Sequence, residues 1–252
     1  MAIKTRKISD WLSANGQAVT NASKATMEDA IRADIGQLYD GVFIMFHLKR
    51  NDYPLAVRVS SWASYQNSGE IADGVLIVDD GRFLVIAPTE GTSKKWSSKP
   101  VSSYDTSGSV QISGVTTTDD RITALNDFAG RANTTAIING STSSNVTNTE
   151  DYAAGFCNKY SRTNSNGKGL TAGSWWLPSE GEMAMIWANF DNINYALSKI
   201  RGATQLQANW YWSSTQASAT RAWFLNIDDG NMYGTSKFDM GWVRPVSSFI
   251  IR

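Results

Sequence analysis

Histidine and cysteine are almost missing from this 252-residue chain, which has one of each, His47 and Cys157. A single cysteine excludes an internal disulfide framework and a thiolate-rich metal centre. A single histidine removes multi-histidine metal sites and the ordinary Ser-His-Asp and Cys-His arrangements. We interpret His47 as a half-buried strand-end residue and Cys157 as an inert buried thiol. Carboxylate-based hydrolysis stays formally open. We nevertheless predict that the chain is not an enzyme and that it has no catalytic residue, no metal and no cofactor.

An excess of charge of either sign is also missing, since 23 Lys and Arg balance 23 Asp and Glu. Without a basic run the chain lacks the electrostatic signature of a nucleic-acid binder. No stretch approaches the roughly 18 apolar residues of a membrane span, so no membrane insertion is expected. No signal peptide is visible after Met1. Charged residues make up 18% of the chain, so Ser, Thr, Asn and Gly must supply the polar surface, as in many β-rich extracellular proteins.

The first part of the chain is predicted to form a separate N-terminal helix and strand module over residues 1–54. Its helix has an apolar stripe at Met27, Ile31, Ile35 and Leu38, and an apolar strand follows at residues 42–46. Such a module is too small to hide both surfaces alone. Packing onto the remaining domain and self-association, for example as a trimer, are both open.

Residues 55–252 are predicted to form one domain with β-structure at both ends. Two apolar runs flank Asp79–Arg82 and predict a hairpin over residues 75–86, and the Ser- and Thr-rich residues 92–115 predict loops. Helices are expected at residues 122–128 and 152–160.

The clearest local signal is the S-x-x-E capping box of Ser179 and Glu182, which begins a helix whose buried stripe is expected to include Met183, Ile186, Trp187 and Phe190. We interpret Glu180 and Glu182 as first-turn carboxylates, not as an acid–base pair. Short strands follow at 211–214, 222–227, 231–233 and 242–246, with an Asp-Gly turn at 228–230. Ten tryptophans are interpreted as core residues.

The ordered motifs WWLPSEGE, YWSST, AWFLNIDDGNMYG and WVRPVSSF resemble the C-type-lectin-like proteins of bacteria and phages. That group includes the variable proteins of diversity-generating retroelements, with relatives in gut Bacteroides and their phages. The resemblance covers residues 71–252. It implies an α+β fold, with two helices against a small, twisted antiparallel sheet.

The resemblance also implies that a fixed scaffold displays a variable region, here at about residues 211–242, whose Asn-type codons are rewritten. Trp, Met and Lys cannot arise from such codons, whereas the residues between them can. The implied ligand-binding residues are Tyr211, Ala219, Thr220, Phe224, Asn226, Asp228, Tyr233, Gly234, Thr235, Ser236, Phe238, Asp239 and Gly241.

The chain departs from two groups that share this fold. It lacks the Gln-Pro-Asp and Glu-Pro-Asn signatures of calcium-dependent sugar binding, and the pairs Asp119-Asp120 and Asp228-Asp229 fall short of the six to eight oxygens that Ca²⁺ prefers. It also lacks the cysteine pair of the formylglycine-generating enzymes.

Strand alternation predicts which implied residues are exposed. Trp223, Leu225 and Ile227 share one face of a strand, so Phe224 and Asn226 are expected on the solvent side. Tyr211, Thr220, Tyr233, Thr235, Phe238 and Asp239 are expected in the same exposed patch. The alternative is that Phe224 and Phe238 complete an aromatic core.

These features predict a non-enzymatic receptor-binding protein whose partner is a protein or glycan on a bacterial surface. The leading interpretation is a phage tail adhesin on the virion surface. A bacterial cell-surface or pilus-tip adhesin of the same fold, and a structural virion protein without receptor binding, are the alternatives.

Overall fold

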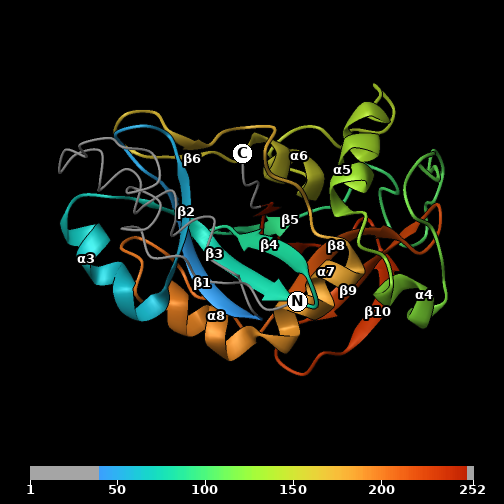
Figure 1. Cartoon of the computed structure of the whole chain (residues 1–252). Helices are drawn as coiled ribbons and strands as arrows, with labels where there is room; N and C mark the ends of the chain where they lie inside the picture. Colours follow the sequence, from blue (N-terminus) through green and yellow to red (C-terminus); the bar gives the residue numbers. More distant parts are fainter. Residues whose placement is uncertain (1–39, 249–252) are drawn as a thin grey trace, which may run out of the picture.

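The apolar run at residues 42–46 lies inside a five-stranded antiparallel sheet in the structure, a computed structural model that describes residues 40–248 (Figure 1). Strand β1 (Gly41–His47) pairs with β2 (Pro54–Arg58) on one side and with β3 (Ala72–Asp79) on the other. Strand β4 (Arg82–Ile86) pairs with β3, and β12 (Val246–Ser247) forms the far edge, giving the order β12-β4-β3-β1-β2.

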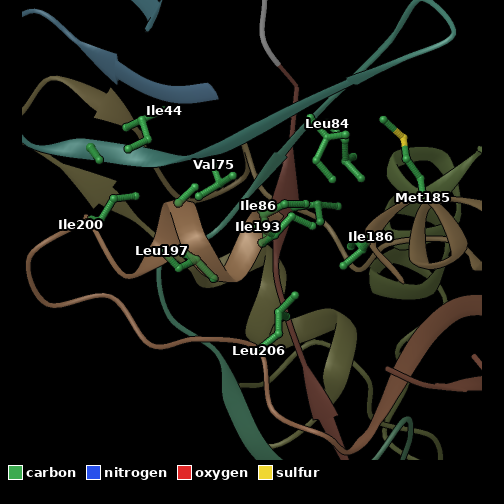
Figure 2. Packing of buried hydrophobic residues seen from close by; sticks show 14 of the residues in the cluster. Ile44, Val75, Leu84, Ile86, Met185, Ile186, Ile193, Leu197, Ile200 and Leu206 are labelled. Atoms are coloured by element: carbon green, nitrogen blue, oxygen red, sulfur yellow. The ribbon is translucent and has the colours of Figure 1, made fainter. Parts of the chain in front are cut away.

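Both faces of this first sheet are buried, which explains its continuous apolar runs. Helices α7 (Glu180–Ala188) and α8 (Phe190–Leu197) cover one face, where Ile44, Val75 and Ile86 meet Ile186 and Ile193 (Figure 2). Trp175 packs on the other face among a second set of strand residues. The short ribbon of β6 (Arg162–Thr163) and β7 (Gly169–Leu170) contributes to that side.

A second five-stranded sheet has the order β10-β9-β8-β11-β5. Its strands are β5 (Gly91–Lys94), β8 (Trp210–Gln216), β9 (Arg221–Asn226), β10 (Met232–Ser236) and β11 (Gly241–Val243). All pairs are antiparallel except β8 with β11. The remaining helices are η1 (Val59–Ser61), α3 (Trp62–Asn67), α4 (Arg121–Leu125), α5 (Gly130–Asn139) and α6 (Ala153–Lys159).

A buried arginine joins the two sheets between β11 and β12. Arg244 is completely buried, and its Nη2 lies 2.6 Å from Oε2 of Glu90. The same guanidinium donates to the carbonyl oxygens of Ala87 (3.0 Å) and Thr204 (3.1 Å). The hydroxyl of Tyr211 also donates to Glu90, at 2.8 Å. Burial raises the pKa of Glu90, and Arg244 opposes that shift.

The local signals of the sequence are confirmed. The first hairpin turns at Asp80 and Gly81, which have φ values of +46° and +73°. The capping box of Ser179 and Glu182 begins α7. Cys157 is buried in α6.

The α+β class is confirmed, but the description of two helices against one small sheet is wrong, because residues 40–248 contain six α-helices and two five-stranded sheets. The boundary expected after residue 54 needs correction too. Strand β1 lies between β2 and β3, so residues 41–54 belong to the same fold as the residues that follow. The predicted helix around Met27–Leu38 lies outside the described residues.

The prediction that Trp187 belongs to the buried stripe of α7 is wrong. Met183 and Ile186 are buried, but Trp187 is 42% exposed and packs against Gly230 of a turn. None of the helices within residues 40–248 is long and apolar enough to cross a membrane.

Candidate functional site

Strands β9 and β10 form the hairpin that carries most of the predicted variable residues. The hairpin turns through Asp229 and Gly230, as predicted, and Gly230 has a φ of +71°. A Cβ atom at Gly230 would lie 2.5 Å from the Trp187 ring, so the turn needs glycine for its conformation and for this close approach. Strand β10 is the outermost strand of the second sheet among the described residues.

An open groove with a volume of about 520 Å³ runs along β10. We call it the β10 groove and define it by its lining residues: Pro100, Ser102, Ser103, Thr106, Thr220, Arg221, Tyr233, Gly234, Thr235, Ser236 and Asp239. Hydroxyl groups dominate this lining, and Arg221 and Asp239 are its charged side chains. The Thr235 hydroxyl donates to the Asp239 carboxylate at 2.5 Å. The groove therefore offers hydrogen-bonding groups and little net charge.

The far wall of the groove is the loop that contains Pro100 and Thr106, and a buried lysine anchors it. Nζ of Lys237 donates to Oε1 of Gln216 (2.7 Å) and to the carbonyl oxygens of Ala219 (3.1 Å) and Val110 (3.4 Å). The same ammonium lies 4.4 Å from the centre of the Trp96 ring. These contacts connect the loop to the β8–β9 turn.

Lys237 is 1% exposed, and none of the acceptors of its ammonium is a carboxylate. Burial disfavours the charged form and lowers the pKa of Lys237 to about 7. The anchor of the groove wall is therefore partly protonated near neutral pH.

An aromatic group lies beside the groove, where Tyr233 is 46% exposed. Its ring centre is 4.7 Å from that of half-buried Trp210, and Trp210 in turn stacks on Phe224 with an interplanar angle of 1°. Tyr233 thus presents an aromatic surface that is supported from below. An exposed aromatic ring among small polar residues is typical of a recognition surface.

The predicted exposure of Phe224 and Tyr211 is wrong. Phe224 is 5% exposed and Tyr211 is fully buried. The prediction from strand alternation requires one face of β9 to meet solvent, but both faces of the second sheet are covered at this strand. Phe224 packs with Trp212 and Leu177 on one face, and Leu225 belongs to the main core on the other.

The structure brings six of the thirteen predicted residues to the groove: Thr220, Tyr233, Gly234, Thr235, Ser236 and Asp239. The others lie elsewhere. Asp228 is exposed at the hairpin turn, and Asn226 beside it is half-buried. The backbone N–H of Asp228 donates to Oδ1 of Asn226 at 3.1 Å. Gly241 is buried against Phe224.

Two predicted residues lie close to the groove without lining it. Ala219 is half-buried and supplies a carbonyl oxygen to Lys237. Phe238 is half-buried, and the ammonium of Lys95 lies 4.1 Å from its ring centre. The alternative prediction, that Phe224 completes an aromatic core, is therefore correct, whereas Phe238 is only partly covered.

Sequence reasoning missed the loop that forms the far wall of the groove. The composition around Pro100, Ser102, Ser103 and Thr106 predicts only a loop, and no periodicity or spacing connects these residues to β10. Tyr104 of this loop is fully exposed. Its isolated position in a Ser-rich stretch was the one available signal.

The single histidine lies far from this groove in the first sheet. Nδ1 of His47 lies 2.5 Å from Oδ2 of buried Asp73, beside a cavity of about 190 Å³ that Arg131 and Ser247 help to line. Burial raises the pKa of Asp73, and His47 opposes the shift. Within residues 40–248, no three His, Cys, Asp or Glu side chains come together in a way that could hold a metal ion.

No protein-family model matches this sequence, and no curated protein matches it. Among solved structures, the chain is similar to a fimbrial protein from Bacteroides ovatus, with 17% sequence identity and a TM-score of 0.40. The similarity covers 66% of this chain and 35% of the fimbrial protein, so it spans about a third of that structure.

Proposed function

We propose that this protein is a non-enzymatic recognition protein with a C-type-lectin-like scaffold and that it binds its ligand in the β10 groove. The observation that carries the proposal is that six of the residues implied to be variable, exposed Tyr233 among them, line one groove. Tyr233 supplies contact area at low entropic cost, and the Ser and Thr hydroxyls supply adaptable hydrogen bonds. The motif order over residues 175–248 supports the scaffold assignment.

The division between rigid and displayed parts supports the same proposal. The residues beneath the groove are fixed by burial and hydrogen bonds: Trp212 donates from Nε1 to the Lys94 carbonyl at 2.9 Å, and Lys237 is anchored three times. The lining residues Thr220 and Tyr233–Ser236 are half-buried or exposed. Substitutions there would change the binding surface with little effect on the core, which is what diversification by a retroelement requires.

The receptor is proposed to be a protein or glycan on a bacterial surface, and the β10 groove is proposed to act in a phage tail adhesin. The alternative carrier is a bacterial cell-surface or pilus-tip adhesin. Neighbouring genes distinguish the two, because tail genes with a reverse transcriptase and a template repeat support the first and fimbrial genes support the second.

The binding test uses the fluorescently labelled full chain and whole cells of a panel of gut Bacteroides strains, read by flow cytometry. Tyr233→Ala is expected to weaken binding to the stained strains at least about tenfold, since an aromatic residue at the centre of a binding site typically contributes about 2 kcal/mol or more. Tyr195→Ala is the matched control, because Tyr195 is 56% exposed and lies on α8, outside the groove. Equal binding by Tyr233→Ala and the parent chain, or no staining of any strain, would contradict the proposal.

A further inference from the structure

The hydrogen-bonding directions of β10 follow from its register with β9. The Lys237 N–H donates to the Thr220 carbonyl at 3.0 Å, and the Asn226 N–H donates to the Asn231 carbonyl at 2.8 Å. These bonds belong to the same register as the pairs Tyr233–Phe224 and Thr235–Ala222. In an antiparallel ladder, alternate residues direct both backbone groups to the partner strand. Odd-numbered residues of β10 therefore face β9, and Met232, Gly234 and Ser236 direct their backbone groups outward.

Two of the outward carbonyl groups already have partners, one at each end of the strand. Nη2 of Arg121 donates to the Met232 carbonyl at 2.5 Å, and the Asp239 N–H donates to the Ser236 carbonyl at 2.9 Å. Gly234 lies between them, and neither its N–H nor its C=O has a hydrogen-bond partner among residues 40–248. Gly234 also lines the β10 groove, so these two groups open into it.

The other edges of the two five-stranded sheets are protected. At the edge of the first sheet, Val246 of β12 forms a β-bridge with Trp176. At the edge of the second sheet, Lys95, which follows β5, forms a β-bridge with Tyr152. Strand β2 begins with a proline and ends with an arginine, which are common devices against edge pairing. Strand β10 has neither a proline nor a charged residue. Its edge is therefore the one whose chemistry permits an added strand.

We propose that the β10 groove binds an extended peptide segment, which adds to the second sheet beside β10 and exchanges backbone hydrogen bonds with Gly234. The inference rests on the proposed function, because it names the ligand class of the same groove. Ser102, Ser103 and Thr106 line the same groove as β10, so an added segment would lie between their hydroxyl groups and the strand. A peptide side chain next to Tyr233 on the same face would be aromatic or β-branched, as cross-strand pairs favour.

The probe is a displayed library of random decapeptides, selected on the immobilised full chain and followed by synthesis of the retained peptides. Each retained peptide is then N-methylated at one residue at a time. Among the described residues, Gly234 has the one outward carbonyl group of β10 without a partner. Strand addition therefore predicts a loss of affinity of at least about tenfold at the one peptide residue whose N–H donates to that carbonyl, and little change at the residues on either side. Equal losses at neighbouring residues, no loss at any residue, or no retained peptide would overturn the proposal.

Two double variants test the Gly234 N–H directly. A Cβ atom at Gly234 would lie 2.8 Å from Cβ of Ala217, so both variants include Ala217→Gly. Ala217→Gly with Gly234→Pro removes the outward N–H without removing a bond to β9, and should weaken peptide binding at least about tenfold. Ala217→Gly with Gly234→Ala keeps the N–H and should bind the peptide at least about tenfold more tightly than the proline variant. Equal binding by the two variants overturns the proposal, and the N-methylation series still decides if the proline variant does not fold.

The two proposals can fail separately. If Tyr233→Ala abolishes cell binding while no decapeptide is retained, the groove recognises another ligand class and only strand addition is refuted. If light scattering shows that the chain dimerises and that Gly234→Pro with Ala217→Gly disrupts the dimer, the edge pairs with a second copy, and the peptide proposal is again refuted.

Discussion

Glu180 is a buried carboxylic acid whose ionisation should destabilise the fold. It is completely buried at the start of α7, and neither carboxylate oxygen makes a hydrogen bond of good geometry with residues 40–248. Burial raises the pKa of Glu180 from 4.5 to about 7, the Asp127 carboxylate adds to the shift, and the nearby Ser213 hydroxyl opposes it. The perturbation that isolates this effect is Glu180→Gln, which keeps the shape and removes the titration.

The expected magnitude follows from linkage. The pKa is higher in the folded than in the unfolded chain, so the favourable contribution of Glu180 is complete below about pH 4.5 and is lost as the pH rises through 7. A difference of about 2.5 pKa units corresponds to about 3 kcal/mol at most. Between pH 5 and pH 8, Glu180→Gln should gain about 2–3 kcal/mol of stability relative to the parent chain.

The assay is urea unfolding of both chains at pH 5, 6, 7 and 8. Glu150→Gln is the matched control, because it makes the same chemical substitution at an exposed glutamate. The free energy of unfolding of Glu150→Gln should follow the parent at every pH. A stability difference for Glu180→Gln that stays constant from pH 5 to pH 8, or a variant that is less stable than the parent at pH 8, would refute the reasoning.

Two further predictions concern the buried cations. Arg244→Ala leaves the buried Glu90 carboxylate without its cation and should cost about 3–5 kcal/mol in urea unfolding, whereas Arg82→Ala, at a surface pair 48% and 93% exposed, should cost well under about 1 kcal/mol. Equal losses would contradict the assigned role of Arg244. Burial lowers the pKa of Lys237 from 10.5 to about 7. The stability that neutral Lys237 contributes to the folded chain is therefore lost as the pH falls through 7. In the parent chain, this titration should raise the free energy of unfolding by about 2–3 kcal/mol between pH 7 and pH 9, and Lys237→Met should lack that rise. An unchanged pH profile in the variant would show that Lys237 does not titrate in this range.

The sequence determined those parts of the fold that depend on neighbouring residues. Asp-Gly pairs tolerate positive φ and predicted both hairpin turns, where Asp80, Gly81 and Gly230 have positive φ. The capping box of Ser179 and Glu182 satisfies backbone groups within one turn, so it located the start of α7. The continuous apolar run of β3 matched a strand buried on both faces.

Tertiary packing decided everything that depends on distant segments. Alternation along β9 is a local rule and could not show that Phe224 is covered by Trp210 and Trp212, which arrive from β8. The same limit applies to Glu180, whose capping role was readable but whose raised pKa comes from burial by the surrounding fold. Local pattern reports which side chains share a face, whereas solvent exposure depends on what packs against that face.

The candidate site divides in the same way. The β10 side of the groove was named from the sequence, because Tyr233 and Thr235 belong to one hairpin with a strong turn signal. The opposite wall at residues 100–106 was not, because contacts between distant segments hold it near β10, such as those of Lys237 with Val110 and of Trp96 with Lys237. Hairpins form from adjacent residues, whereas a groove forms where segments distant in sequence meet, and only the folded structure shows where that happens.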